Sequence, residues 1–299
     1  MGDRQGGGLR RRARARRVAM FVLALLLVCA CWELYKTVGP DAGGKILGAR
    51  LLPKAENRAM PHVWDMARRF GRPELRGSSR TVGQAVAAGA WYTFRLAFVG
   101  LLLGVIVGMG LAILMARFRV VERGLLPWLI ISQTVPLIAL APLVVSWGGR
   151  LHIGGFTWQK WMSASVIAAF LAFFPVAVGA LRGLTSPPPA ALELLASYAA
   201  PWSATLFKLR LPAAVPYLMP ALRLAANAAV IGTIVAEIST GLKGGIGRLI
   251  LEYMREATAD PAKVFTAVMG AAVLGLVMAG LVGLLDGFVS RHRPRELTT

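Results

Sequence analysis

The sequence predicts an all-helical protein that crosses a membrane six times. Of its 299 residues, 56% are hydrophobic and 16% are charged, whereas a soluble domain has about 25% charged residues. The apolar residues also fall into six runs, each long enough to cross a hydrocarbon layer of about 30 Å. Lipid offers the backbone no hydrogen-bond partner, so each run is expected to form a helix. The runs are residues 18–35, 91–116, 125–147, 161–181, 215–238 and 264–289.

Basic residues at the ends of these runs predict the orientation of the chain. The arginine-rich tail of residues 1–17 is expected in the cytoplasm, and six crossings return the basic tail of residues 291–299 to the same side. The first helix, residues 18–35, then leads into an extracytoplasmic loop, residues 36–90. That loop is itself basic, but long loops cross a membrane with less regard for charge. Residues 91–290 hold the other five helices as a core.

The formal charge of +20 does not indicate a nucleic-acid-binding protein. The basic residues lie between apolar runs and not on one face of a compact domain, so anionic lipid headgroups are the expected partners of this charge. His62, His152 and His292 lie in predicted loops or tails, and no Cys/His cluster has the spacing of metal ligands. Residues 39–45 begin like a phosphate-binding loop, but Ile46 replaces the Ser or Thr that holds Mg²⁺. We therefore expect no catalytic residue, metal or cofactor.

The first run admits two interpretations. Basic residues followed by residues 18–32 resemble a signal peptide, and residues 28–31 resemble a lipoprotein cleavage box. The five further runs favour an uncleaved first transmembrane helix. Within the loop that follows, residues 62–70 either form a short amphipathic helix on the membrane surface or belong to an ordinary loop.

Glycines predict where helices pack closely. Gly100, Gly104 and Gly108 recur at a helical spacing that lets two backbones approach in lipid, and Gly283 and Gly287 share this spacing.

Prolines predict where helices bend. Pro127, Pro136 and Pro142 in the third run, and Pro216 and Pro220 at the start of the fifth, are expected to break or kink helices. Broken helices at membrane depth are tolerated where they line a cavity or are covered by protein. A translocation path near these runs is therefore expected.

The segment of residues 187–212 joins the fourth and fifth runs and is expected on the cytoplasmic side. Its residues 190–200 are good helix formers set between prolines, which predicts a short projecting helix. The segment resembles the cytoplasmic loop in permease subunits of binding-protein-dependent ABC importers. Glu193 matches the acidic residue of that motif, Leu209 stands for its Ile, and Leu211 and Pro212 match its end.

Three positions depart from the family's motif. Leu194 and Leu195 stand where the family has alanines, and Ala199 stands where it has a glycine. In the family this loop is the coupling helix that docks on the ATPase subunit. The resemblance therefore implies a coupling role for Glu193, Leu194, Leu195, Ala196, Ser197, Ala199 and Ala200.

Further segments resemble one branch of this family, the nitrate, sulfonate and taurine permeases, with relatives for thiamine and riboflavin precursors. These segments follow the branch's order along the chain. They are residues 134–143 (TVPLIALAPL), 173–175 (FFP), 212–216 (PAAVP), 221–223 (ALR), 235–237 (VAE) and 245–250 (GIGRLI).

The resemblance implies a type I ABC importer permease fold and a set of partners. These are a second permease copy in a homodimer, two copies of an ABC ATPase subunit, and an extracytoplasmic substrate-binding protein that is one candidate contact for residues 62–70. ATP hydrolysis would take place on the separate subunit, so this chain is expected not to be an enzyme. The implied solute is a sulfonate, nitrate or a vitamin precursor.

Polar residues in the runs are candidates for lining the translocation path. They are Gln133, Arg223, Asn227, Thr233 and Glu237. Charged groups at membrane depth are costly, so Arg223 and Glu237 either hold helices together or line a gate. Gln133, Asn227 and Thr233 either contact the solute transiently or form hydrogen bonds between helices.

Two rival functions stay open at this point. A secondary transporter driven by an ion gradient would be expected to show inverted repeats and acidic residues at midspan, and neither is found in the sequence. A membrane anchor or sensor without transport activity is the other rival, and the prolines and polar groups within the runs argue against it. An ATP-driven importer permease is the leading hypothesis.

Overall fold

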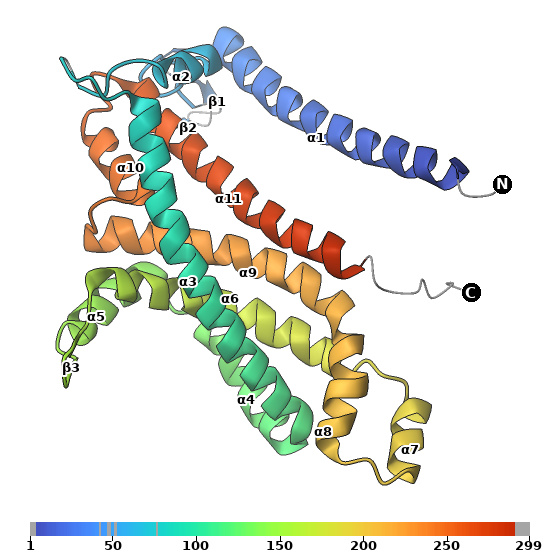
Figure 1. The fold of residues 1–299 in the computed structure, drawn as a ribbon. Coiled ribbons are helices and arrows are strands. Elements are labelled where there is room, and N and C mark those ends of the chain that lie inside the picture. Colours follow the sequence, from blue (N-terminus) through green and yellow to red (C-terminus); the bar gives the residue numbers. More distant parts are fainter. Residues whose placement is uncertain (1–3, 42, 47–48, 51–52, 76, 291–299) are drawn as a thin grey trace. The chain divides into compact units, whose positions relative to one another are not determined.

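The computed structural model describes residues 4–41, 43–46, 49–50, 53–75 and 77–290, and most of these are helical (Figure 1). The elements are α1 (Arg4–Val38), β1 (Lys45–Ile46), β2 (Ala49–Arg50), α2 (Val63–Arg69), α3 (Val82–Arg117), α4 (Arg119–Ser132), α5 (Leu137–Gly148), β3 (His152–Ile153), β4 (Phe156–Thr157), α6 (Lys160–Leu184), α7 (Pro189–Ser197), α8 (Trp202–Thr205), a π-helix (Leu206–Arg210), α9 (Leu211–Thr240), α10 (Ile246–Arg255) and α11 (Pro261–Ser290). The predicted tail of residues 291–299 and the first three residues of the tail 1–17 lie outside the described residues.

The predicted number of membrane-spanning segments is confirmed within the described residues. Five helical stretches are long and apolar enough to cross a bilayer, and α4 with α5 forms a sixth candidate. The third predicted span is not straight, because α4 and α5 are inclined by 100° to each other. The break falls at residues 133–136, where Pro136 precedes α5. Pro216 and Pro220, in contrast, lie inside α9 without ending it.

The chain divides into two compact units. The first unit takes in Met1–Gly83 and Tyr253–Thr266. Its helix α1 begins at Arg4, so helical structure extends through most of the predicted basic tail, and only Ala19–Val38 qualifies as a span. Of the two interpretations of residues 62–70, the structure shows a short helix, α2, whose Met66 is buried.

Polar contacts fix the C-terminal end of α1 to the loop before α2. Trp32 donates its indole N–H to the carbonyl oxygen of Pro61 at 3.0 Å. The Glu33 carboxylate accepts a hydrogen bond of 2.6 Å from the Val63 backbone N–H and lies 2.8 Å from Nδ1 of His62. The rest of the apolar part of α1 is exposed in this chain, as expected for a helix in lipid.

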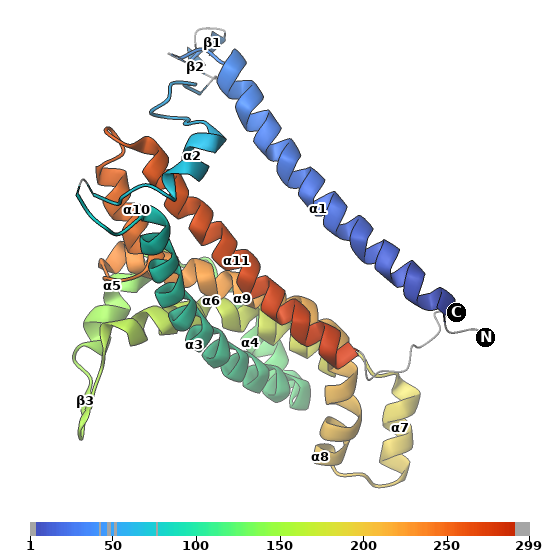
Figure 2. The ribbon, with the colours of Figure 1, turned by 45° about the horizontal axis from the view of Figure 1, so that its top comes forward.

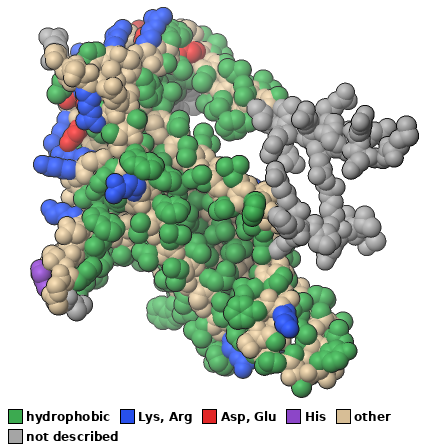
Figure 3. Space-filling model, in the orientation of Figure 1, with side chains coloured by type: hydrophobic (Ala, Val, Ile, Leu, Met, Phe, Trp, Pro, Cys, Tyr) green, Lys and Arg blue, Asp and Glu red, His purple; other side chains and the backbone are tan. Residues whose placement is uncertain are grey.

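The second unit takes in Gln84–Glu252 and Ala267–Thr299, and its centre is the packing of α6 along α9 with α5 against both (Figures 1 and 2). Half of the buried residues of this core are alanines, which let the helix axes approach closely. On the face drawn in Figure 3, hydrophobic side chains cover the middle of the second unit. Exposed apolar side chains such as Ile106, Ile138 and Leu284 are expected to contact lipid.

The glycines of α3 pack as their spacing predicts. A Cβ atom on Gly104 would lie 2.7 Å from Cβ of Ala172, and one on Gly108 would lie 2.6 Å from the carbonyl oxygen of Phe173, both in α6. Only glycine allows this separation of α3 and α6. Gly283 and Gly287 differ, because a Cβ built on either would meet no described atom of another helix within 4 Å.

Candidate functional site

The predicted coupling segment forms a helical hairpin that projects from the second unit (Figures 1 and 2). Pro188 is extended and Pro189 opens α7, which suits a residue that lacks a backbone N–H. None of the nine residues of α7 is buried in the chain as described. Glu193 is exposed, and Leu194 is 57% exposed although it is apolar. The second unit therefore leaves α7 uncovered, with a carboxylate and an apolar side chain on its surface.

The turn after α7 has the geometry of a Schellman motif with an alanine in the glycine position. The Ala199 N–H donates to the Ala196 carbonyl at 2.9 Å, and the Ala200 N–H donates to the Leu195 carbonyl at 3.0 Å. Ala199 has φ of 49°, which makes it the one non-glycine residue with positive φ among the described residues. A left-handed conformation costs an L-residue about 1–2 kcal/mol. The turn at Ala199, where the sequence departs from the family's motif, is therefore strained.

Replacing the strained alanine should stabilise α7. Ala199→Gly is expected to increase the protection of the α7 amides against hydrogen exchange about fivefold, because glycine removes about 1 kcal/mol of strain at this position. Hydrogen exchange of the membrane-embedded protein, read by mass spectrometry, measures this. Ala196→Gly inside α7 is the matched control and should lower protection. Equal protection in Ala199→Gly and the original chain would contradict the strain.

Two arginines attach the base of the hairpin to neighbouring helices of the second unit. Arg210 donates from Nη1 to the carbonyl oxygen of Leu184, the last residue of α6, at 2.9 Å. The Arg117 guanidinium at the end of α3 lies 5.0 Å from the centre of the Trp202 ring in α8, a cation–π arrangement. The π-helix Leu206–Arg210, which ends with one of these arginines, leads directly into α9. The base of the hairpin is thus connected to α3, α6 and α9.

A largely apolar groove of about 580 Å³ lies in the second unit, between α6 and α9 at the break between α4 and α5. Phe174 and Pro175 from the FFP segment line it, with Pro220 from α9. Its polar side chains are those of Gln133, Arg182 and Tyr217. Of the five predicted path residues, only Gln133 lines this groove.

Glu237 is fully buried and joins three helices of the second unit. It accepts a hydrogen bond from the Thr93 hydroxyl of α3 and one from the Gly247 N–H of α10, each at 2.8 Å. The Thr93 hydroxyl oxygen in turn accepts the Ile246 N–H at 2.9 Å. A Cβ on Gly245 would overlap the Glu237 carboxylate. The VAE and GIGRLI segments therefore meet in one buried cluster, and the carboxylate caps the N-terminus of α10.

Sequence reasoning did not single out Thr93. Its only local signal is a hydroxyl within an apolar run, and such a residue most often bonds to its own helix.

The remaining path candidates lie apart from this cluster. Arg223 donates from Nη2 to Oδ2 of Asp286 in α11 at 2.5 Å, and both side chains are partly exposed. Thr233 is buried and donates to the Ala229 carbonyl of its own helix at 2.9 Å. Asn227 is exposed on α9.

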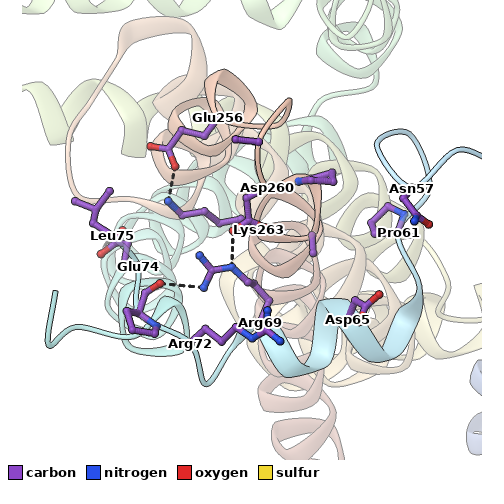
Figure 4. A pocket seen from close by; sticks show the side chains of 14 residues that line it. Asn57, Pro61, Asp65, Arg69, Arg72, Glu74, Leu75, Glu256, Asp260 and Lys263 are labelled. Atoms are coloured by element: carbon purple, nitrogen blue, oxygen red, sulfur yellow. Dashed lines mark hydrogen bonds and ion pairs between the residues drawn. The ribbon is translucent and has the colours of Figure 1, made fainter. Parts of the chain in front are cut away.

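The first unit holds a cavity of about 710 Å³ that we call the charged pocket (Figure 4). Its charged lining residues are Asp65, Arg69, Arg72, Glu74, Glu256, Asp260 and Lys263. One wall is α2 with the residues after it, and the other is the connection between α10 and α11. Because residues 65–74 and 256–263 are far apart in the sequence, no motif predicts this pocket.

Ion pairs and hydrogen bonds tie the two walls together. Arg69 donates from Nε to Oδ2 of Asp260 at 2.5 Å, and Tyr253 donates its hydroxyl to Oε1 of Glu74 at 2.8 Å. Burial and the bond to Glu74 raise the pKa of the Tyr253 phenol. Lys263 is 2% exposed, with Nζ 2.5 Å from Oε2 of Glu256 and 4.4 Å from the centre of the Tyr253 ring. The contacts Arg69–Asp260 and Tyr253–Glu74 therefore join the two walls of the pocket.

Comparisons with known proteins agree with this architecture. Residues 85–291 match the family described as binding-protein-dependent transport system inner membrane component. The chain is 34% identical over 183 residues to a probable ABC transporter permease of Haemophilus influenzae, which covers 61% of this chain and 68% of that protein. It is 29% identical over 243 residues to a formylaminopyrimidine transport permease of Halalkalibacterium halodurans, with 78% and 92% covered.

A third relative is a Bacillus subtilis protein named for aliphatic sulfonates transport, 30% identical over 190 residues that cover 64% of each chain. The names of these relatives agree with the branch that the motifs of residues 134–250 indicate. The match to the family spans the five core helices, the coupling hairpin and the buried Glu237 cluster. This chain belongs to the binding-protein-dependent transport system inner membrane components and is the permease subunit of an ABC importer.

Proposed function

We propose that two copies of this chain pair to enclose a translocation path, with one ATPase subunit docked on each α7. Both chain termini then lie in the cytoplasm, and a substrate-binding protein delivers the solute from the other side. The observation that carries the proposal is α7 itself, which exposes Glu193 and Leu194 while its base is attached to α3 and α6. A helix that is exposed and attached to the core only at its base can transmit a force applied by another subunit to the core helices.

The mechanism follows from these attachments. ATP-driven approach of the two ATPase subunits displaces α7, and the displacement passes through Arg117, Arg210 and the π-helix into α3, α6 and α9. The groove between α6 and α9 is the part of the path that opens or closes. Nucleotide biases this equilibrium only as far as it binds the two conformations with different affinity.

The polar residues divide between two roles in this proposal. Glu237 with Thr93, and Arg223 with Asp286, hold helices in register during the movement. Gln133 in the groove and Asn227 on α9 offer weak, neutral contacts to a passing solute. Thr233 bonds to its own helix and is assigned to packing.

The solute is proposed to be a small polar compound of the sulfonate, nitrate or vitamin-precursor kind. Support comes from the relatives named for formylaminopyrimidine and aliphatic sulfonates transport.

Cysteine labelling tests the orientation on which the proposal depends. In a chain with Cys29 and Cys31 replaced by serine, Ser197→Cys at the end of α7 should react with a membrane-impermeant maleimide only in inverted vesicles. Arg58→Cys, an exposed position in the predicted extracytoplasmic loop, is the matched control and should react only in right-side-out vesicles. Labelling of Ser197→Cys from outside would place α7 beyond the reach of a cytoplasmic ATPase and overturn the proposal.

A further inference from the structure

The charged pocket of the first unit carries nearly balanced charge. Its lining has three basic side chains and four acidic ones. A simple anion entering the pocket would approach four carboxylates, and a simple cation would approach two guanidinium groups and an ammonium group. Repulsion of this kind disfavours binding of a ligand that carries charge of only one sign.

Most of these charges already have partners within the first unit. Arg69 pairs with Asp260, Lys263 pairs with Glu256, and Glu74 accepts the Tyr253 hydroxyl. Glu74 also lies 3.8 Å from Nε of Arg80. These pairs hold the walls in place before any ligand arrives, and a preformed site lowers the ordering cost of binding.

Two charged side chains in the lining are left for a ligand, and they have opposite signs. Asp65 lies on α2, and Arg72 lies three residues after the last residue of that helix. Both side chains are exposed (Figure 4). Within the described residues, neither side chain forms an ion pair or a hydrogen bond. One short segment therefore presents a free carboxylate and a free guanidinium to the same cavity.

We propose that the charged pocket receives a small zwitterionic solute, whose anionic group binds Arg72 and whose ammonium group binds Asp65. The cavity of about 710 Å³ is within the range of about 300–1,000 Å³ typical of small-molecule sites. Arg72 offers the planar pair of donors that suits a carboxylate or sulfonate. The inference rests on the proposed function, because the solute is taken to be the one that the importer carries.

Binding of four related probes tests the inference. The full chain in nanodiscs is titrated by calorimetry with taurine, with β-alanine, with ethanesulfonate, which lacks the amine, and with ethylamine, which lacks the acid. The zwitterions are expected to bind at least about 10-fold more tightly than ethanesulfonate or ethylamine, because each charged contact contributes a factor of this size. A preference between taurine and β-alanine would identify the anionic group as sulfonate or carboxylate.

Single variants assign the two contacts. Arg72→Gln and Asp65→Asn should each weaken binding of the preferred zwitterion at least about 10-fold, and Asp65→Asn should also improve binding of ethanesulfonate. Both side chains are exposed, so folding should not be affected. Arg58→Gln, which changes an exposed arginine outside the pocket lining, is the matched control and should bind as the original chain does.

The inference is overturned if ethanesulfonate binds as tightly as taurine, or if neither zwitterion binds. It is also overturned if Arg58→Gln weakens binding as much as Arg72→Gln does. These results would leave the importer proposal standing as long as Ser197→Cys is labelled only from the cytoplasmic side. The two proposals therefore fail separately.

Discussion

Glu193→Arg is expected to lower the ATP hydrolysis that the assembled importer shows with solute-loaded binding protein at least about 10-fold. The carboxylate is exposed on α7, where we propose that the ATPase docks, so the substitution brings a positive charge and a longer side chain into that interface. Placing like charges together in an interface costs several kcal/mol, which exceeds the 1.4 kcal/mol that equals a factor of about 10. Reconstituted complexes in proteoliposomes provide the measurement.

Two variants separate docking from folding in this experiment. Glu193→Gln removes the charge but keeps the size, and an intermediate loss of stimulated hydrolysis is expected. Asp41→Arg reverses an exposed acidic residue in the predicted extracytoplasmic loop and should leave hydrolysis unchanged. All three variants should reach the membrane in equal amounts. Full stimulation in Glu193→Arg would show that α7 is not the docking element.

Glu237→Ala is expected to destabilise the second unit by about 3 kcal/mol, since it leaves the Gly247 N–H and the Thr93 hydroxyl buried without their acceptor, at about 1–3 kcal/mol for each group. For a chain of 299 residues, that loss lowers the midpoint of thermal unfolding by about 5 °C. The measurement is the fraction that stays monodisperse in detergent after heating. Glu237→Gln keeps one acceptor oxygen but turns an amide NH₂ toward the other donor, so an intermediate loss is expected.

A surface carboxylate serves as the comparison for Glu237. Glu252→Ala removes a partly exposed partner of Arg248 at i,i+4 spacing on α10. Pairs of this kind contribute about 0.3–0.5 kcal/mol, so little change is expected. If Glu237→Ala unfolds at the same temperature as Glu252→Ala, the three-helix cluster contributes nothing to stability.

Local features of the sequence predicted the helical elements well. The six runs, the coupling hairpin and the break of the third span at Pro136 all depend on residues close together in the chain. Hydropathy, proline and helix propensity act over this short range. The bend of 100° between α4 and α5 was not predicted in size, because it depends on what packs around Pro136.

Pairings between distant residues could not be predicted in this way. The sequence marked Glu237 and Arg223 as costly charges at membrane depth, and the structure supplies their partners, Thr93 and Asp286. The sequence does not indicate the role of Thr93, because a threonine in an apolar run occurs for many reasons unrelated to function. The charged pocket depends in the same way on segments that are far apart in the chain.

The amino-acid sequence alone specified the class of protein, the spans and the position of α7 along the chain. These follow from the transfer of apolar segments into lipid and from local helix propensity. The partners of each buried charge and the shape of the two cavities depend instead on how the helices pack. Buried polar groups must find partners wherever the packing brings donors and acceptors within bonding distance. That condition couples residues such as Thr93 and Glu237 across 144 positions of the chain.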